Sequence, residues 1–163
     1  SDGTAIYDFL GKDKSDGFEI EVDTAISENW HLIFAYANVN AEVDADVNSN
    51  RIGQTLLNAP ENTASIWSRW QVNEEWAVGL GINHAGKRYG SAFAGNGDQS
   101  TRLQLPDYTL VDLGVYYTGE LFDATVKFGN ITDEEYYVSS TRNTNIVPGV
   151  PATGTFSLLK RFD

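Results

Sequence analysis

The chain has 163 residues, with 11 basic and 23 acidic side chains that give a net charge of −12. A surface this negative repels phosphate backbones, which argues against nucleic acid as a partner. The chain has no cysteine, which excludes disulfides and thiolate metal sites. Its length suits one domain, and its 15 glycines and 12% aromatic residues suit short strands and turns, so an all-β fold is predicted.

Seven segments alternate bulky apolar residues with small or charged ones, which is the pattern of strands with one apolar and one polar face. The clearest runs from Trp76 to Ala85, where the bulky residues share one face and the opposite face is nearly bare. We therefore predict an antiparallel meander of about seven strands. In chain order the segments begin at Phe18, Trp30, Ala64, Trp76, Tyr108, Ala124 and Thr155, and the last runs to Phe162.

The charges divide between the two faces in a way that suits a membrane strand. A charge that faces lipid near the bilayer midplane costs about 2–4 kcal/mol, whereas one that faces a wet lumen does not. Only Lys160 falls on the apolar face, near a strand end from which it can reach the interface. On this assignment Leu80→Arg should block assembly and Gly81→Ser should be tolerated. The charges on the polar face are Glu19, Glu21, Asp23, Arg69, Asp112, Lys127 and Arg161.

Short and long connections alternate along the chain. Tight turns are predicted at residues 27–29, 73–75 and 119–121, and long polar loops at 41–61, 87–106 and 131–151. Trp30, Trp70 and Trp76 flank two of the turns, where an aromatic belt at the inner membrane interface is expected. Turns at one rim and loops at the other are typical of an outer-membrane barrel, although alternation alone equally suits a soluble antiparallel sandwich.

Several motifs, in the same order, resemble the C-terminal barrel strands of TonB-dependent siderophore receptors. Ser15–Glu21 is similar to the family's S-x-G-[FVIL]-E-x-E strand opening, and Leu105–Asp112 is similar to L-P-x-Y-x-x-x-D. The most specific match is N-[LI]-x-D-x-x-Y, with Asn130, Asp133 and Tyr136 in the motif positions. Further matches are Asn58–Asn62, Gly79–Tyr89, Pro148–Pro151 and the closing strand through Phe162.

The resemblance implies that residues 1–163 are the C-terminal portion of a large transmembrane β-barrel, with the plug domain and upstream strands absent. Seven strands, or eight if Ala5–Leu10 adds a partial one, are too few to close such a barrel. An open or curled sheet is therefore expected for the isolated piece. The implied location is the outer membrane of a Gram-negative bacterium, in contact with its lipid.

The implied function is import of a ferric siderophore or similar scarce ligand, with energy from the TonB complex through the N-terminal part of the full-length chain. Asp112, Arg69 and Lys127 would line the wall against the plug. Ligand contacts are expected from aromatic and basic groups of the outer loops and upper lumen, which suit an anionic iron chelate. These candidates are Arg88, Tyr89, Phe93, Arg102 and Arg142.

No catalytic constellation is evident, so no enzyme activity and no cofactor are predicted. His31 and His84 are too far apart for a metal motif, and each is expected at a rim or in the lumen. The segment Gly95–Asp98 lacks the ligand spacing of a calcium loop. Two alternatives remain open at this point: a passive porin-like or adhesin-like barrel, and a soluble carbohydrate-binding β-sandwich.

Overall fold

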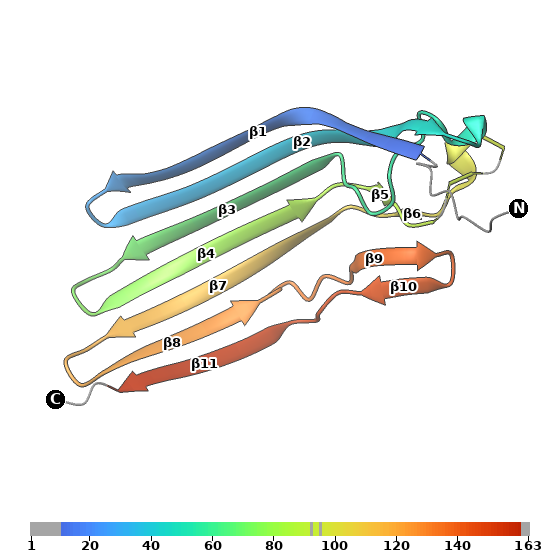
Figure 1. The fold of residues 1–163 in the computed structure, drawn as a ribbon. Coiled ribbons are helices and arrows are strands. Elements are labelled where there is room, and N and C mark those ends of the chain that lie inside the picture. Colours follow the sequence, from blue (N-terminus) through green and yellow to red (C-terminus); the bar gives the residue numbers. More distant parts are fainter. Residues whose placement is uncertain (1–10, 92, 95, 161–163) are drawn as a thin grey trace, which may run out of the picture.

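The computed structural model describes residues 11–91, 93–94 and 96–160. Its main feature is one antiparallel sheet of seven strands, each paired with the next in chain order (Figure 1). The described residues form no α-helix, and none of their helical segments is long and apolar enough to cross a membrane. The strands of the sheet are β1 (Gly11–Ser27), β2 (Trp30–Asp46), β3 (Asn62–Gln71), β4 (Trp76–Ala85), β7 (Tyr108–Thr118), β8 (Phe122–Gly129) and β11 (Thr153–Lys160).

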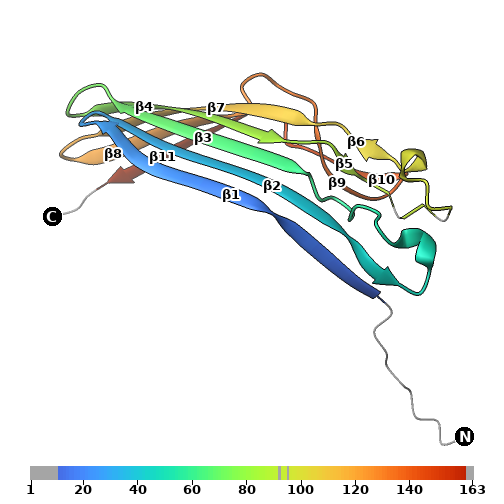
Figure 2. The same ribbon diagram turned by 90° about the horizontal axis from the view of Figure 1, so that it is seen from above.

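The connections lie as the sequence predicts, with short turns at one end of the sheet and long excursions at the other (Figure 1). Asn73 closes the β3–β4 turn, because its side-chain oxygen accepts hydrogen bonds from the backbone N–H groups of Glu75 and Trp76. The sheet is open and curved rather than flat (Figure 2). Among the described residues no second large sheet packs on it, whereas a soluble sandwich needs one.

Strand register confirms the two faces. Residues directly opposite each other in antiparallel strands place their side chains on the same face. One transverse row carries only bulky apolar side chains across five strands: Val22, Phe34, Ile66, Ile82 and Val111. A second row across six strands carries Trp30, Trp70, Val78, Val115, Val126 and Phe156. These side chains are part of an extensive exposed apolar face, which in Phe156 reaches 66% exposure.

The charges of the described strands obey the same register. Asp23 and Asp112 share a row with Trp67 on the polar face, and Arg69 and Lys127 share the next row. Lys160 lies opposite Phe122 on the apolar face, as predicted. Arg161 and Phe162 lie outside the described residues, as does the predicted partial strand at Ala5–Leu10.

Two strands are longer than the sequence predicts. β1 begins at Gly11 rather than near Phe18, and β2 continues to Asp46, through residues expected to form a loop. In this extension the two faces exchange character, because ion pairs line its outward side while Ala41 and Val43 of β2 are buried on the inward side. Lys12 bonds Asp44 and Lys14 bonds Glu42, each at 2.8 Å. Exposed pairs of this kind contribute little stability, so the ladder of backbone hydrogen bonds holds the extension.

The long connections are folded rather than plain loops. The connection between β4 and β7 contains a small hairpin of β5 (Arg88–Tyr89) and β6 (Gln104–Leu105), and the one between β8 and β11 contains β9 (Tyr137–Arg142) and β10 (Asn145–Pro148). Two 3-10 turns complete them, Ser49–Arg51 and Gln99–Thr101. The sequence hides these elements because each strand is too short to show alternation.

The bare polar face of β4 is covered by one aromatic ring. A Cβ atom built on Gly79 would lie 2.5 Å from the indole of Trp67, and one built on Gly81 would lie 2.7 Å from it. The sequence pattern predicts open space on this face at both glycines. That prediction is wrong, because the Trp67 ring fills the space. Gly81→Ser is therefore not a neutral change, because the added side chain would displace the ring of Trp67.

The two faces can be tested by placing the same charge on each. In the full-length protein, Leu80→Arg should abolish folded barrel in the outer membrane, because its guanidinium would face hydrocarbon at a cost of about 2–4 kcal/mol. Ser65→Arg should fold nearly normally, because Ser65 lies on the polar face opposite Ala35 and Asn83. Heat-modifiable mobility of outer-membrane fractions measures both yields, and equal yields for the two variants would contradict the assignment.

Candidate functional site

The candidate site is the cluster formed by the three long connections at the outer end of the sheet, together with the polar wall below it. Two polar side chains join the connections, each through a pair of hydrogen bonds to the backbone of a distant residue. Asn58 donates to the backbone oxygen of Ser140 at 2.8 Å and accepts from its N–H at 2.9 Å. Gln54 in the same way donates to Ala94 and accepts from it, both at 2.8 Å. Residues 40 and 82 positions apart are thus held by paired amide contacts.

Arg102 is one of two buried arginines among the predicted ligand contacts. It is 6% exposed, and it donates to the backbone oxygens of Thr55 at 2.7 Å and Ser91 at 3.1 Å. Its guanidinium lies 4.2 Å from the ring centre of Tyr89 and 5.3 Å from that of Phe93. Burial lowers the pKa of Arg102, but an arginine remains protonated at neutral pH. The cation therefore joins two loops and two aromatic rings.

Arg88 is placed in a similar way but at a different point. It is 4% exposed, it donates to the backbone oxygens of Gly86, Tyr137 and Val138, and it lies 5.2 Å from the ring centre of Tyr108. Arg88 thus fastens the β9 strand to the outer ends of β4 and β7. The side chain of Arg142 lies outside what the structure describes, although its backbone belongs to β9.

The structure brings Tyr89, Phe93 and Arg102 together, and two of them border a hollow. This hollow measures about 430 Å³ and is lined by residues of the β4–β7 connection and of the β9–β10 turn. Asn143 and Thr144 close it on the turn side, opposite Phe93 and Arg102. It offers an aromatic ring and a cation edge to a bound molecule. Its full lining is Ser91, Phe93, Ala94, Thr101, Arg102, Asn143 and Thr144.

The predicted motif residues close the base of the β8–β11 connection. Asn130 is 4% exposed and has a left-handed backbone with φ of 51°. Its amide donates to the backbone oxygens of Glu134 at 3.0 Å and Val150 at 3.2 Å, and accepts from the N–H of Glu134 at 2.9 Å. Asp133 accepts from the N–H of Ala152 at 2.9 Å. The two side chains therefore join both ends of this connection.

Tyr136 and Asp112 extend that closure to the sheet. The Tyr136 ring lies 4.5 Å from that of Tyr108, and its hydroxyl accepts from the N–H of Val150 at 3.3 Å. Asp112 accepts from the N–H of Asn130 at 2.9 Å and from the side chain of Asn83 at 3.1 Å. The polar wall and the base of the outer loop thus share one carboxylate.

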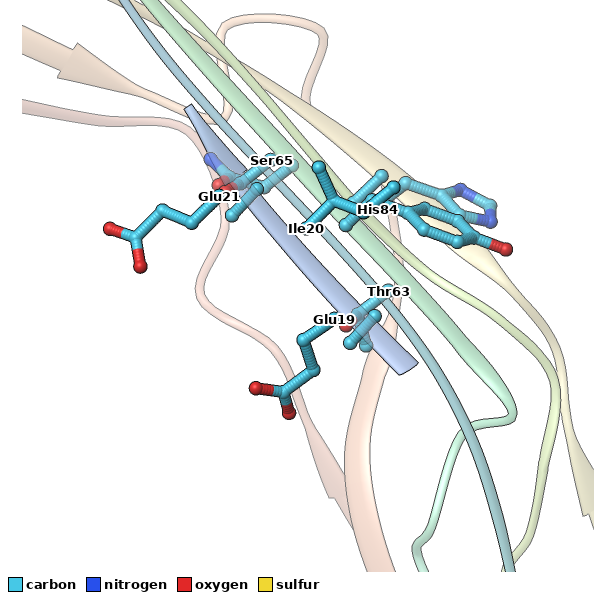
Figure 3. Close-up of a pocket in the computed structure, with 11 residues that line it drawn as sticks. Glu19, Ile20, Glu21, Thr63, Ser65 and His84 are labelled. Atoms are coloured by element: carbon cyan, nitrogen blue, oxygen red, sulfur yellow. The ribbon is translucent and has the colours of Figure 1, made fainter. Parts of the chain in front are cut away.

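A shallow hollow of about 390 Å³ lies over β1 to β4, and residues of both faces of the sheet line it. Glu19 and Glu21 project from one side of β1, whereas Ile20 and His84 lie on the other (Figure 3). Small residues such as Ala35 and Ser65 leave the space between the strands open. Lower on the wall, His31 bonds Asp23 at 2.7 Å. This wall carries charged side chains, as the alternation predicts.

The remaining candidates have simple structural roles. His84 contacts the Thr109 hydroxyl at 3.0 Å on the outward side of the upper rim, and among the described residues no group of three His, Asp or Glu side chains could hold a metal ion. Asp98, in the segment compared with a calcium loop, begins the 3-10 turn by accepting from the N–H of Ser100. Hydrogen bonding from the Ser100 side chain, and next from its backbone N–H, lowers the pKa of the Asp98 carboxyl.

Comparison with known proteins identifies the family. Residues 1–132 match the family described as TonB dependent receptor-like, beta-barrel. The chain belongs to the TonB-dependent receptor family. This match favours a receptor barrel over the passive-pore, adhesin-like and soluble-sandwich alternatives.

One curated relative is the metal-pseudopaline receptor CntO of Pseudomonas aeruginosa, which is 34% identical over 154 residues. The alignment covers 91% of this chain and 21% of that receptor, so the chain spans about a fifth of the length of the relative that it matches.

Solved structures share the fold. The siderophore receptor PiuA of Acinetobacter baumannii superimposes with a TM-score of 0.80 at 19% identity, over 92% of this chain and 22% of PiuA. The ferripyoverdine receptor of the outer membrane of Pseudomonas aeruginosa, solved with ferripyoverdine, gives a TM-score of 0.74 at 22% identity, over 91% of this chain and 19% of that receptor. The open sheet is therefore a segment of a receptor barrel fold.

The closure by Asn130 can be tested by separating its backbone and side-chain roles. Asn130→Gly keeps the left-handed backbone accessible but removes three buried hydrogen bonds, each worth about 0.5–1.5 kcal/mol. In the full-length protein we expect at least tenfold faster proteolysis between residues 130 and 152, with cleavage sites mapped by mass spectrometry. Asn145→Gly, at the exposed tip of the same connection, should change the rate little. Equal protection in both variants would contradict the closure.

Proposed function

We propose that this chain forms part of the wall and outer loops of an outer-membrane importer that takes up ferric siderophores with energy from TonB. The observation that carries the proposal is the family match over residues 1–132, together with an apolar face long enough to meet lipid. The names of relatives support the ligand class, since PiuA and Fiu are both named as siderophore receptors.

The rest of such an importer would close the sheet. Among the described residues the outer edges of β1 and β11 have no strand partner. In hydrocarbon each unpaired backbone group costs several kcal/mol, so both edges need further strands. We propose that the remaining barrel strands and a plug domain are supplied by the full-length protein, with residues 1–163 as the C-terminal portion of its barrel. The plug and the TonB complex are then partners of the whole receptor.

The ligand would meet the outer cluster first. The guanidinium groups of Arg88 and Arg102 donate to backbone oxygens. In this proposal they mainly hold the loops in place, because fewer of their N–H groups remain for a chelate. Phe93 and the edge of Arg102, in the hollow closed by Asn143 and Thr144, are the proposed contact surface. An aromatic ring beside a cation suits an anionic chelate with flat organic groups.

A second ligand class is favoured by one specific relative. CntO, at 34% identity, is named as a metal-pseudopaline receptor rather than a ferric one. Both ligands are metal chelates, so the outer cluster serves either class by the same chemistry. A growth test that contains both kinds of chelate distinguishes them.

The function can be tested with the full-length gene in a receptor-deficient, metal-starved strain. We expect growth to be restored by at least one chelate from a panel of ferric catecholates, ferrioxamine and metal-loaded pseudopaline. Deleting TonB from the same strain should abolish that growth, because import depends on its energy. Restored growth that does not need TonB, or no growth with any chelate despite a folded barrel, would contradict the proposal.

The position of the ligand can be tested by filling the outer hollow. Asn143→Trp should raise the chelate concentration for half-maximal uptake about tenfold, which corresponds to about 1.4 kcal/mol of lost binding free energy. The matched control is Asn96→Trp, an exposed position of the neighbouring connection that does not line the hollow. If both variants take up the transported chelate like the unmodified receptor, this hollow is not part of the ligand site.

A further inference from the structure

We propose that the apolar face carries a binding site for an anionic phospholipid at the short-turn rim, between β8 and β11. This inference rests on the proposed membrane location, because it requires that the apolar face meet lipid. It concerns the outside of the wall and is separate from the ligand site of the outer cluster.

The site begins with an apolar hollow on the outward face. It measures about 240 Å³, and it is lined by Leu121, Phe122, Leu158 and the stem of Lys160. Leu121 is 72% exposed and Leu158 is 58% exposed, so both offer open apolar surface. A hollow of this size and lining fits a segment of an acyl chain, since apolar walls gain free energy by excluding water.

A positive charge stands at the end of this hollow. Register places Lys160 opposite Phe122, two residues beyond Leu158 on the same face. A lysine here is expensive only if it lies deep, because the cost of a lipid-facing Lys falls from about 2–4 kcal/mol at the midplane to about 0–1 kcal/mol near an interface. Lys160 is level with the turn that follows Thr118, so its ammonium lies at an interface.

Aromatic side chains mark the same level. The Trp76 and Tyr117 rings are 5.0 Å apart, and the Tyr117 and Phe122 rings are 5.3 Å apart. Aromatic residues gather where a barrel meets the lipid headgroups. The rings of Trp76, Tyr117 and Phe122 therefore mark the depth of the lipid headgroups. Lys160, at one end of the hollow, lies at the same depth.

Local charge complementarity selects the occupant. Although the chain as a whole is negative, Lys160 places a positive charge on the apolar face beside the hollow. An ammonium offers three donors, so it can serve a lipid phosphate together with another acceptor. A lysine near an anionic membrane surface contributes about 1 kcal/mol of attraction. An anionic phospholipid fits both parts of the site, with its acyl chain in the apolar hollow and its headgroup at Lys160.

The inference can be tested on the full-length receptor purified in detergent, titrated with phosphatidylglycerol or phosphatidylethanolamine and observed by native mass spectrometry. The unmodified receptor should retain phosphatidylglycerol in preference to phosphatidylethanolamine. Lys160→Gln should weaken phosphatidylglycerol retention about fivefold, the ratio that corresponds to the contribution of one interfacial lysine. Leu121→Ser should weaken it as well, because Leu121 lines the hollow.

Lys127→Gln is the matched control, since it removes the same charge from β8 on the opposite face. Unchanged retention in Lys160→Gln, an equal loss in Lys127→Gln, or equal retention of the two lipids would each overturn the inference. Growth on the transported chelate separates this outcome from the proposed function. We expect Lys160→Gln to support growth normally, and a receptor that imports nothing or is missing from the outer membrane would contradict the function itself.

Discussion

The structure depends on one constraint, which is that backbone N–H and C=O groups in hydrocarbon must be paired within the protein. An antiparallel ladder satisfies this for the inner strands, and register then fixes which side chains meet lipid and which meet water. The alternation of apolar and polar residues is the trace of that requirement in the sequence. The same constraint makes β1 and β11 incomplete edges, so the sheet has the shape of a wall segment.

The sequence was sufficient for the sheet and insufficient for its outer ends. The sequence predicts β4 with its correct bounds, Trp76–Ala85, because bulky apolar residues follow one face of this strand for most of its length. The outer halves of β1 and β2 escape the prediction because the faces exchange there: ion pairs such as Lys14–Glu42 line the outward side, and Ala41 and Val43 are buried on the inward side. The alternation of apolar and polar residues continues in β2, but an interpretation that expects the apolar residues to face outward ends before it.

The outer site was only partly foreseen, for a different physical reason. The aromatic and basic character of Tyr89, Phe93 and Arg102 predicts them as ligand contacts, and the structure brings the three together. The residues that hold the loops, Gln54 and Asn58, were not singled out as such, because their partners are distant in sequence and are mostly backbone atoms. Two motif matches carry a signal, Asn58–Asn62 and the segment around Asn130, because Asn58 and Asn130 both have a left-handed backbone that favours asparagine or glycine.

The ring of Trp67 lies over Gly79 and Gly81, and this packing constrains how the three positions evolve in the family. The indole occupies the space in which side chains at positions 79 and 81 would stand. Residues that share one space show strongly non-additive effects. Loss of the ring would expose a bare backbone strip, and gain of a side chain would collide with the ring. Positions 67, 79 and 81 should therefore co-vary among related receptors. A smaller residue at position 67 should accompany larger residues at positions 79 and 81.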